Sequence, residues 1–174
     1  MAYQDKELSY KAKDDVIQSS RFEVILLSSS NELFSGKALQ EWLPERCQLR
    51  EITHTSSDLM RELTLFTKQK RKKSLLVLAE LEAMGSFSKG FPCLRIIRET
   101  HPSVVTMLMT RETVHHDLTH HRLPICDATL HMPFTEDDFD VALYAAAKNN
   151  ALWQERVEEL RYQQPNWPAA GRLS

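Results

Sequence analysis

Short apolar runs recur along the chain, and segments with apolar residues at helical spacing separate them. The most pronounced run, LLVLA at residues 75–79, follows basic residues and leads through Glu80 to a turn at Gly85. A continuous apolar run of this kind is typical of a strand that is buried on both faces of a parallel sheet. Ligands gather at the carboxyl ends of such strands, so we expect Glu80 at the functional edge of the domain.

The remaining apolar runs predict four more strands, over Phe22–Leu27, Gln48–Thr53, 104–109 and within Leu123–Leu130. The Gln48–Thr53 run is more polar and is expected near a sheet edge. Predicted helices cover Glu32–Leu43, the residues after the capping Ser56–Asp58, those after Pro92, Glu112–His121, and a last long stretch from Thr135. Strands that alternate with helices predict an α/β fold, a doubly wound five-stranded parallel sheet with a long C-terminal helix.

The last predicted helix continues beyond the point at which the sheet is complete, over a length of roughly 40 Å. Its apolar positions are separated by threes and fours, and Pro165 ends the pattern. Such a heptad pattern is typical of a coiled coil, in which one Asn at an a position fixes a parallel pair. We therefore expect a homodimer through this helix. The seam would contain Phe139, Leu143, Ala146, Asn150, Trp153, Val157 and Leu160. The alternative is that the distal part folds back over its own domain.

The length of 174 residues indicates one domain with appended segments. We assign residues 1–20 to an N-terminal arm, 21–148 to the domain, and 149–174 to a helical extension and tail. The three cysteines, Cys47, Cys93 and Cys126, have apolar neighbours and wide spacing, which is typical of buried thiols in a reducing compartment.

The charge balance gives no global attraction to nucleic acid or lipid, because 22 basic residues face 24 acidic ones and the net charge is −2. The basic run Lys68–Lys73 is expected to be a solvated loop, and no direct binding of nucleic acid is expected. No apolar run approaches the roughly 20 residues that span a bilayer, and the N-terminus is too charged for a signal peptide. The expected location is cytoplasmic, without membrane contact.

Two stretches resemble the receiver domain of bacterial response regulators. They are Val77–Gly85 (VLAELEAMG), which is similar to the third strand of that family, and Leu130–Phe139 (LHMPFTEDDF), which is similar to its turn into the last helix. Pro133-Phe134 before an acidic helix start is the most specific match. The resemblance covers about residues 21–148 and implies the receiver fold.

The resemblance also implies where a phosphorylation site would lie. A working receiver has an acidic pair after the first strand for Mg²⁺, an aspartate on the third strand, Ser or Thr after the fourth, and Lys after the fifth. The corresponding residues here are Ser28 and Ser29 (or Ser30 in a shifted register), Glu80, Thr110 and Met132, so that only Thr110 matches. Phosphoryl transfer needs charge stabilisation, and one carboxylate among hydroxyls is a poor Mg²⁺ site. We expect a pseudo-receiver without a phosphorylation site, enzymatic activity or cofactor.

The substitutions are compatible with one another. Without the acidic pair a lysine would be an unpaired cation in a half-buried pocket, whereas Met132 fills that space without a charge. Glu80 is one methylene longer than aspartate and could reach toward Thr110. Two interpretations stay open at this point: Glu80 mimics a phosphorylated aspartate, or it is a polar residue tolerated at the end of a strand.

Four histidines in HHDLTHH offer a different candidate site, at residues 115–121. On a helix, His116 and His120 would share one face at a spacing that can chelate Zn²⁺. Two ligands alone do not retain an ion, so we expect no bound metal. The sequence therefore predicts a phosphorylation-independent receiver-like signalling module that acts by protein-protein interaction and dimerisation in a bacterial signalling or transcription pathway. The alternative is a ligand or metal sensor that uses the emptied acidic pocket or the His115–His121 helix.

Overall fold

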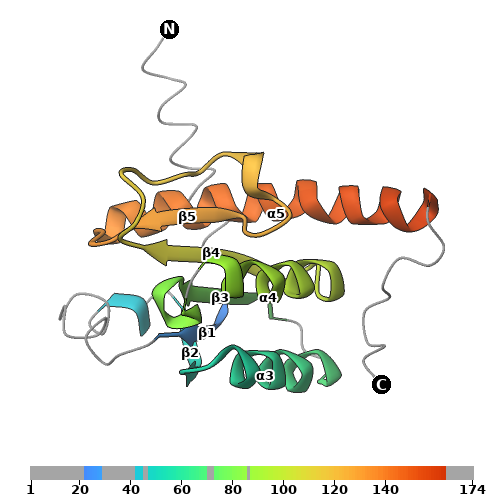
Figure 1. Cartoon of the computed structure of the whole chain (residues 1–174), viewed down its shortest axis with the longest axis horizontal. Coiled ribbons are helices and arrows are strands. Elements are labelled where there is room, and N and C mark those ends of the chain that lie inside the picture. The colour runs from blue at the N-terminus through green and yellow to red at the C-terminus, as the bar shows by residue number, and fades with distance from the viewer. Residues whose placement is uncertain (1–21, 29–41, 45–46, 70–72, 86, 164–174) are drawn as a thin grey trace, which may run out of the picture.

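The computed structural model describes residues 22–28, 42–44, 47–69, 73–85 and 87–163. Its centre is a parallel sheet in the strand order β2-β1-β3-β4-β5 (Figure 1). The strands are β1 (Glu23–Leu27), β2 (Gln48–Thr53), β3 (Leu75–Glu80), β4 (Val105–Thr110) and β5 (Ala128–His131). The predicted five-stranded parallel sheet is confirmed, and the polar β2 lies at an edge as expected.

Alternate residues of the strands supply two separate apolar cores. Val24 and Leu26 of β1 belong to the core that also contains Phe139 of the last helix, whereas Ile25 and Leu27 pack with the helices on the other face. Because side chains alternate along a strand, a fully apolar strand fills both cores. The helices around the sheet are α3 (Ser56–Lys68), α4 (Phe87–Thr100) and α5 (Glu136–Gln163), with short 3₁₀ turns η2 (Glu82–Met84) and η3 (His120–Arg122).

The helix starts differ in detail from the prediction. Thr55 caps α3, since its hydroxyl accepts a hydrogen bond from the amide of Asp58. Helix α4 begins at Phe87, before Pro92, and the proline lies inside it. Helix α5 starts with a reciprocal cap. The Thr135 hydroxyl accepts from the Asp138 amide at 3.2 Å, and the Asp138 carboxylate accepts from the Thr135 amide at 2.8 Å.

The predicted helix over Glu112–His121 is wrong. Residues 111–119 form bends and one antiparallel bridge in which Asp117 pairs with Thr129 at the outer edge of β5, and η3 follows. The segment offers no stripe of apolar residues to bury against the sheet, so packing does not favour a helix. Most of the helix predicted over Glu32–Leu43 lies outside the described residues. The described residues 42–44, at its end, are helical.

The long C-terminal helix is confirmed, but its seam faces its own domain. Leu143, Asn150, Trp153 and Val157 are each at most 3% exposed, and Leu160 is half-buried. The side-chain nitrogen Nδ2 of Asn150 donates to the backbone carbonyls of Pro102 and Val104. These residues therefore fold back onto the sheet and η3, which is the alternative arrangement, and they do not form an exposed dimer seam. The reason is that a helix packs against a sheet with nearly the same periodicity as against another helix.

Helix α5 runs without a break across residue 148, the expected boundary between domain and extension. Three segments lie outside the described part of the chain: the N-terminal arm, the tail after Gln163, and residues 70–72 in the middle of the basic run. All three cysteines carry free thiols. Among the described helices, none combines the length and the apolar character needed to cross a membrane.

Candidate functional site

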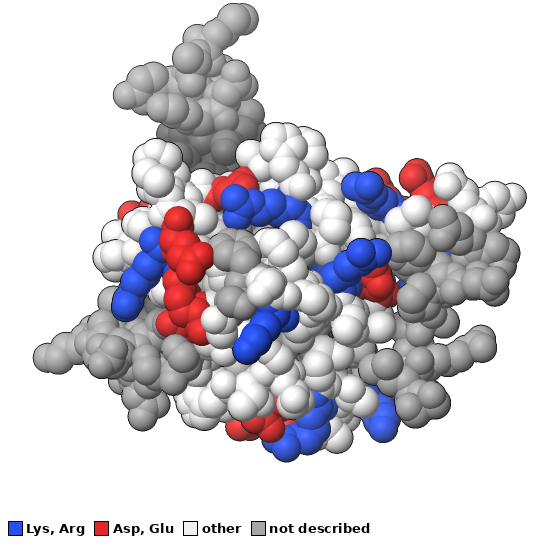
Figure 2. All heavy atoms as spheres, in the orientation of Figure 1, with Lys and Arg blue, Asp and Glu red and all other residues white. Residues whose placement is uncertain are grey.

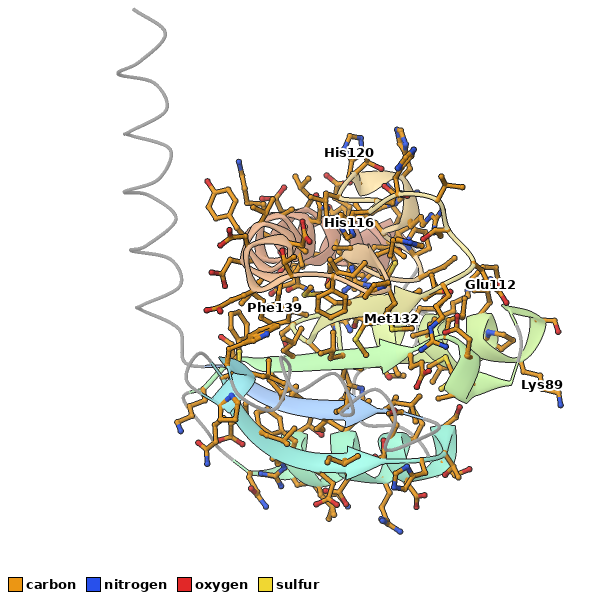
Figure 3. All side chains as sticks on the ribbon, turned by 90° about the vertical axis from the view of Figure 1, so that its left-hand side faces the viewer. Lys89, Glu112, His116, His120, Met132 and Phe139 are labelled. Atoms are coloured by element: carbon orange, nitrogen blue, oxygen red, sulfur yellow. The ribbon has the colours of Figure 1, made fainter. Side chains whose placement is uncertain are left out.

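The residues of the candidate site lie where β1, β3, β4 and β5 end. Ser28 follows β1, Glu80 and Thr110 end β3 and β4, and Met132 follows β5. Figure 3 shows Met132 beside this carboxyl edge of the sheet. The parallel register produces the arrangement, since strands that run in one direction present their last residues at one edge. The structure thus brings four of the five predicted site residues to one edge, and Ser29 lies outside the described residues together with Ser30.

Glu80 and Ser28 are joined by a buried hydrogen bond. The Ser28 hydroxyl donates to Oε2 of Glu80 at 2.9 Å, and the two residues are 0% and 5% exposed. They meet because β1 and β3 are neighbours, with Leu27 opposite Ala79 one residue earlier. A carboxylate away from solvent needs such donors to offset its desolvation. The side chain of Glu80 is therefore bound toward β1.

Glu82, which the sequence analysis did not single out, makes the contact that was expected of Glu80. Its Oε1 accepts hydrogen bonds from the Thr110 hydroxyl and from the Arg111 amide, both at 2.8 Å. The 3₁₀ turn after β3 brings Glu82 over the end of β4, and Gly85 closes that turn with a φ of 86°. The second acidic residue in VLAELEAMG was the available signal, but its position depends on a turn that periodicity does not reveal.

The hydroxyl of Thr110 is hydrogen-bonded both to the turn after β3 and to the loop that follows β4. It donates to Glu82 and accepts from the amide of Glu112 at 3.1 Å. A hydroxyl has one proton to donate, so Thr110 has no donor left for an incoming anion while this arrangement holds.

Met132 places an apolar side chain at the end of β5. It is 6% exposed and belongs to the same core as Phe139 and Leu130. Its amide donates to the Thr110 carbonyl at 2.9 Å, which continues the β4–β5 ladder by one bond. The peptide bond that joins it to Pro133 is cis. Position 132 therefore contributes packing and no charge.

The side chains at this edge do not fit the Mg²⁺ ion that receiver chemistry uses. Magnesium is bound by carboxylate and phosphate oxygens in near-octahedral geometry. Within the described residues no group of three or more His, Cys, Asp or Glu side chains is arranged to hold a metal ion. Oxygen Oε2 of Glu80 is hydrogen-bonded to a neutral serine, and Glu82 is bound to Thr110 and Arg111.

The histidines do not form the predicted pair. His120 lies in η3 and is exposed, while His116 lies in the preceding loop beside α5 (Figure 3). The Nδ1 atom of His116 accepts from the backbone amide of His131 at 3.0 Å, and Nε2 lies 3.6 Å from the carboxylate of Asp138. His116 therefore ties the loop to β5 and to the start of α5. The shared helix face required for a metal pair with His120 is absent because residues 116–119 are not helical.

Solved structures similar to the chain include two receiver domains and one response regulator. The signal receiver domain of an HD domain-containing protein from Pseudomonas fluorescens Pf-5 is 18% identical, with a TM-score of 0.52, and the match covers 75% of this chain and 98% of that one. The beryllofluoride-activated DrrB receiver domain is 14% identical, with a TM-score of 0.50 and coverages of 73% and 97%. The RcsB response regulator of Salmonella typhimurium is 15% identical, with a TM-score of 0.51 and coverages of 80% and 68%.

No protein-family model matches the sequence, and neither does any curated protein. At this level of identity the structural likeness shows the fold, which is that of a response regulator receiver domain.

Proposed function

We propose that this chain uses a receiver fold as a phosphorylation-independent signalling module that acts by binding other proteins. The receiver fold supports a role in signal transduction of the two-component type. The finer statement rests on the chemistry of the carboxyl edge, because a fold alone does not determine an activity.

The observation that supports the proposal most directly is the buried hydrogen bond between Ser28 and Glu80. At the position where the resemblance expects an acid, Ser28 is a neutral donor to the carboxylate. An acid there would repel Glu80, whereas a serine satisfies it. A metal ion at this position would have to displace that contact.

The contacts of Glu82 and Thr110 extend the same argument to the neighbouring strand. In a working receiver the hydroxyl after the fourth strand would meet the phosphoryl group. Here the Thr110 hydroxyl already donates to a carboxylate of the same chain. The side chain of Glu82 therefore accepts the hydrogen bond that the Thr110 hydroxyl could otherwise donate to a phosphoryl group. It also accepts from the Arg111 amide, which attaches the start of the loop after β4 to the turn after β3.

A phosphotransfer assay tests the proposal. The chain is incubated with acetyl phosphate and Mg²⁺ and analysed by intact mass, with a phosphorylatable receiver domain in parallel to check the reagent. We expect no phosphorylated protein. A stoichiometric gain of one phosphoryl group by the unmodified chain would contradict the proposal.

A variant that restores the working residues serves as the matched control. It combines Ser28→Asp, Ser29→Asp, Glu80→Asp and Met132→Lys. Gain of phosphorylation by this variant alone would attribute the inactivity of the natural chain to the side chains at the edge and not to the fold.

A protein partner is proposed in preference to nucleic acid because basic residues are not in excess, with 22 Lys and Arg against 24 Asp and Glu. Figure 2 shows basic and acidic side chains interspersed over one face, with large uncharged areas between them. Binding to nucleic acid depends mainly on a concentrated basic surface that neutralises phosphates. A pull-down from the native host, with the Glu80→Ala variant for comparison, tests whether the partner depends on the state of the carboxyl edge.

Homodimerisation is proposed through the outer face of α5, since its inner face is buried. Val141 and Leu152 lie three turns apart on that face and are 42% and 47% exposed. Exposed apolar side chains in register along a helix favour association with a second helix.

A further inference from the structure

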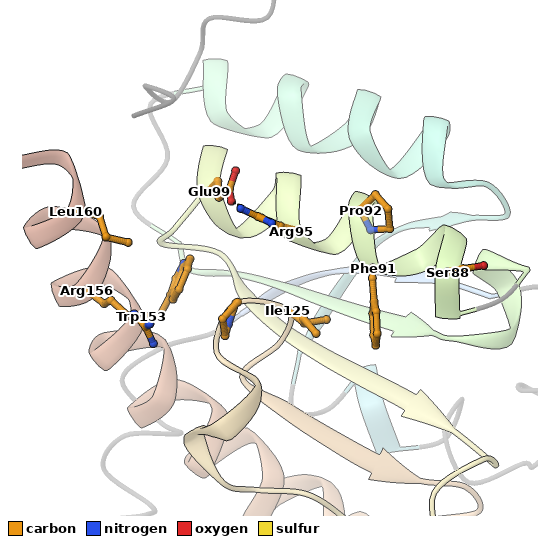
Figure 4. Close-up of a pocket in the computed structure, with 10 residues that line it drawn as sticks. Ser88, Phe91, Pro92, Arg95, Glu99, Ile125, Trp153, Arg156 and Leu160 are labelled. Atoms are coloured by element: carbon orange, nitrogen blue, oxygen red, sulfur yellow. The ribbon is translucent and has the colours of Figure 1, made fainter. Parts of the chain in front are cut away.

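A groove lies between α4, the loop before β5 and the distal part of α5 (Figure 4). It has a volume of about 690 Å³. We call it the α4–α5 groove, and its main lining residues are Phe91, Arg95, Ile125, Trp153, Arg156 and Leu160. None of the residues of the carboxyl edge described above lines it. Its volume falls within the range of roughly 300–1,000 Å³ that is typical of sites for small ligands.

The groove exists because two elements have unusual lengths. The crossover from β4 to β5 has only the short turn η3 where a doubly wound sheet usually has a helix. Helix α5 has 28 residues against four in β5, so that its distal part extends past the sheet. That part packs through Trp153 and Val157 against Leu123 and leaves the space in front of α4 open.

The walls are apolar and partly fixed. Figure 4 shows Phe91 projecting from α4, and Trp153 and Leu160 projecting from α5 toward it. The indole nitrogen of Trp153 donates to the backbone carbonyl of Arg98 at 2.9 Å, and its ring lies 5.0 Å from the Arg98 guanidinium. A wall that is held in place before binding loses little conformational entropy when a ligand arrives.

The rim has one positive charge in excess. Arg95 is paired with Glu99 at 2.7 Å, so these two charges offset each other. Arg156 is exposed and has no ion-pair partner among the residues that the structure describes. A guanidinium beside an apolar cleft favours a ligand with a carboxylate at one end, because the planar fork binds carboxylate oxygens in pairs.

We propose that the α4–α5 groove binds a small amphipathic carboxylic acid, with its apolar body between Phe91, Trp153 and Leu160 and its carboxylate on Arg156. The site is separate from the carboxyl edge, so this binding neither requires nor excludes the signalling function proposed above. Because Trp153 contacts both the groove and Arg98 of α4, a bound acid would stabilise the present position of α5 against α4.

Isothermal titration calorimetry with three probes of equal chain length tests the charge requirement. The probes are octanoate, octanol and octylamine. We expect saturable binding of octanoate to one site, binding of octanol weaker by about tenfold, and no binding of octylamine, since one charge-assisted contact accounts for about a factor of ten or more. Absence of octanoate binding, or equal binding of the alcohol or the amine, would overturn the proposal.

Three variants test the location. Arg156→Gln is expected to remove the preference for octanoate over octanol, and Arg61→Gln, an exposed arginine of α3, is the matched control and should leave that preference unchanged. Leu160→Glu places a carboxylate in the groove and should reduce octanoate binding by more than about tenfold. Thermal unfolding by circular dichroism checks that each variant is folded. A preference that persists in Arg156→Gln, or is lost equally in Arg61→Gln, would overturn the assignment.

Discussion

The guanidinium of Arg98 and the carboxylate of Asp127 form a two-pronged ion pair that is fully buried. Their nitrogen–oxygen distances are 2.6 Å and 2.7 Å, and both side chains are 0% exposed. The pair joins α4 to the residue before β5, and the Thr106 amide donates to the same carboxylate at 2.8 Å. Burial raises the pKa of Asp127 to about 6, and the Arg98 charge and the Thr106 amide oppose this rise. The paired contacts with the guanidinium favour the ionised form of this carboxylate.

Replacement of Arg98 by methionine should destabilise the protein strongly. The substitution leaves Asp127 in the core without its partner, so that the carboxyl either stays charged and unpaired or takes up a proton, and breaking a buried pair in this way typically costs about 3–5 kcal/mol of unfolding free energy. Urea unfolding at pH 7 measures the effect. Arg95→Gln, which removes an arginine from an exposed pair one turn earlier on α4, is the control and should change stability far less. Similar losses of unfolding free energy in the two variants would show that the buried ion pair contributes no more to stability than the exposed one.

Asn150 should stabilise the folded monomer and should not contribute to dimerisation. Its side-chain nitrogen donates to Val104 and to Asp127, at 3.0 Å and 3.2 Å. Asn150→Ala leaves these buried acceptors with one donor fewer, which should lower the unfolding free energy by about 1–3 kcal/mol. Sedimentation velocity should give the same oligomeric state for the variant and the natural chain. A change of oligomeric state at unchanged stability would restore the coiled-coil interpretation.

The outer face of α5 should control self-association if the chain forms a dimer. Leu152→Glu introduces a charge on that face and should weaken association by about tenfold or more, because a buried leucine contributes about 1.5–3 kcal/mol to a contact. Leu65→Glu on α3, which replaces another leucine of similar exposure, is the control. Sedimentation equilibrium measures both dissociation constants. Equal constants for the two variants would place the contact elsewhere.

The contribution of His101 to stability should fall as pH decreases through the range in which histidine titrates. Burial lowers the pKa of His101, whose Nε2 is buried without a hydrogen-bond partner within the described residues. The unfolded chain then binds a proton more readily than the folded one. His101 therefore contributes stability above its ordinary pKa that is lost as pH falls toward the lowered value.

Urea unfolding of the natural chain and of His101→Gln between pH 5 and 8 isolates this contribution. The natural chain should become more stable relative to His101→Gln as pH increases. A difference that is independent of pH would show that His101 titrates alike in both states.

The strands could be predicted because a fully apolar run has few alternatives in a chain of this size. Residues 75–79 have no polar face, so they fit only the middle of the sheet. The segment Glu112–His121 was predicted as a helix mainly from its polar composition and its place between two strands. Its actual structure depends on contacts with distant residues, such as the pairing of Asp117 with Thr129, and local propensity does not encode these.

The sequence predicted which residues lie at the candidate site, but it did not predict which of them are hydrogen-bonded to one another. Glu80 followed from an apolar run and the other residues at the strand ends from the resemblance to receiver domains, whereas the exchange of partners between Glu80 and Glu82 depends on one 3₁₀ turn. Arg98 gave no signal at all, because a charged residue on a helix is usually solvated and its partner Asp127 lies 29 residues away. The seam of α5 was recognised, but its period does not distinguish a second copy from the chain's own sheet.

The pairing of Asp117 with Thr129 has a consequence for the solubility of the fold. The two residues exchange both backbone hydrogen bonds, each 2.8 Å long, along the outer side of β5. An edge strand with open amides and carbonyls is a template for intermolecular strand addition and aggregation. By covering the middle of a four-residue strand with its own loop, the chain leaves little free edge at that end of the sheet for a foreign strand to extend.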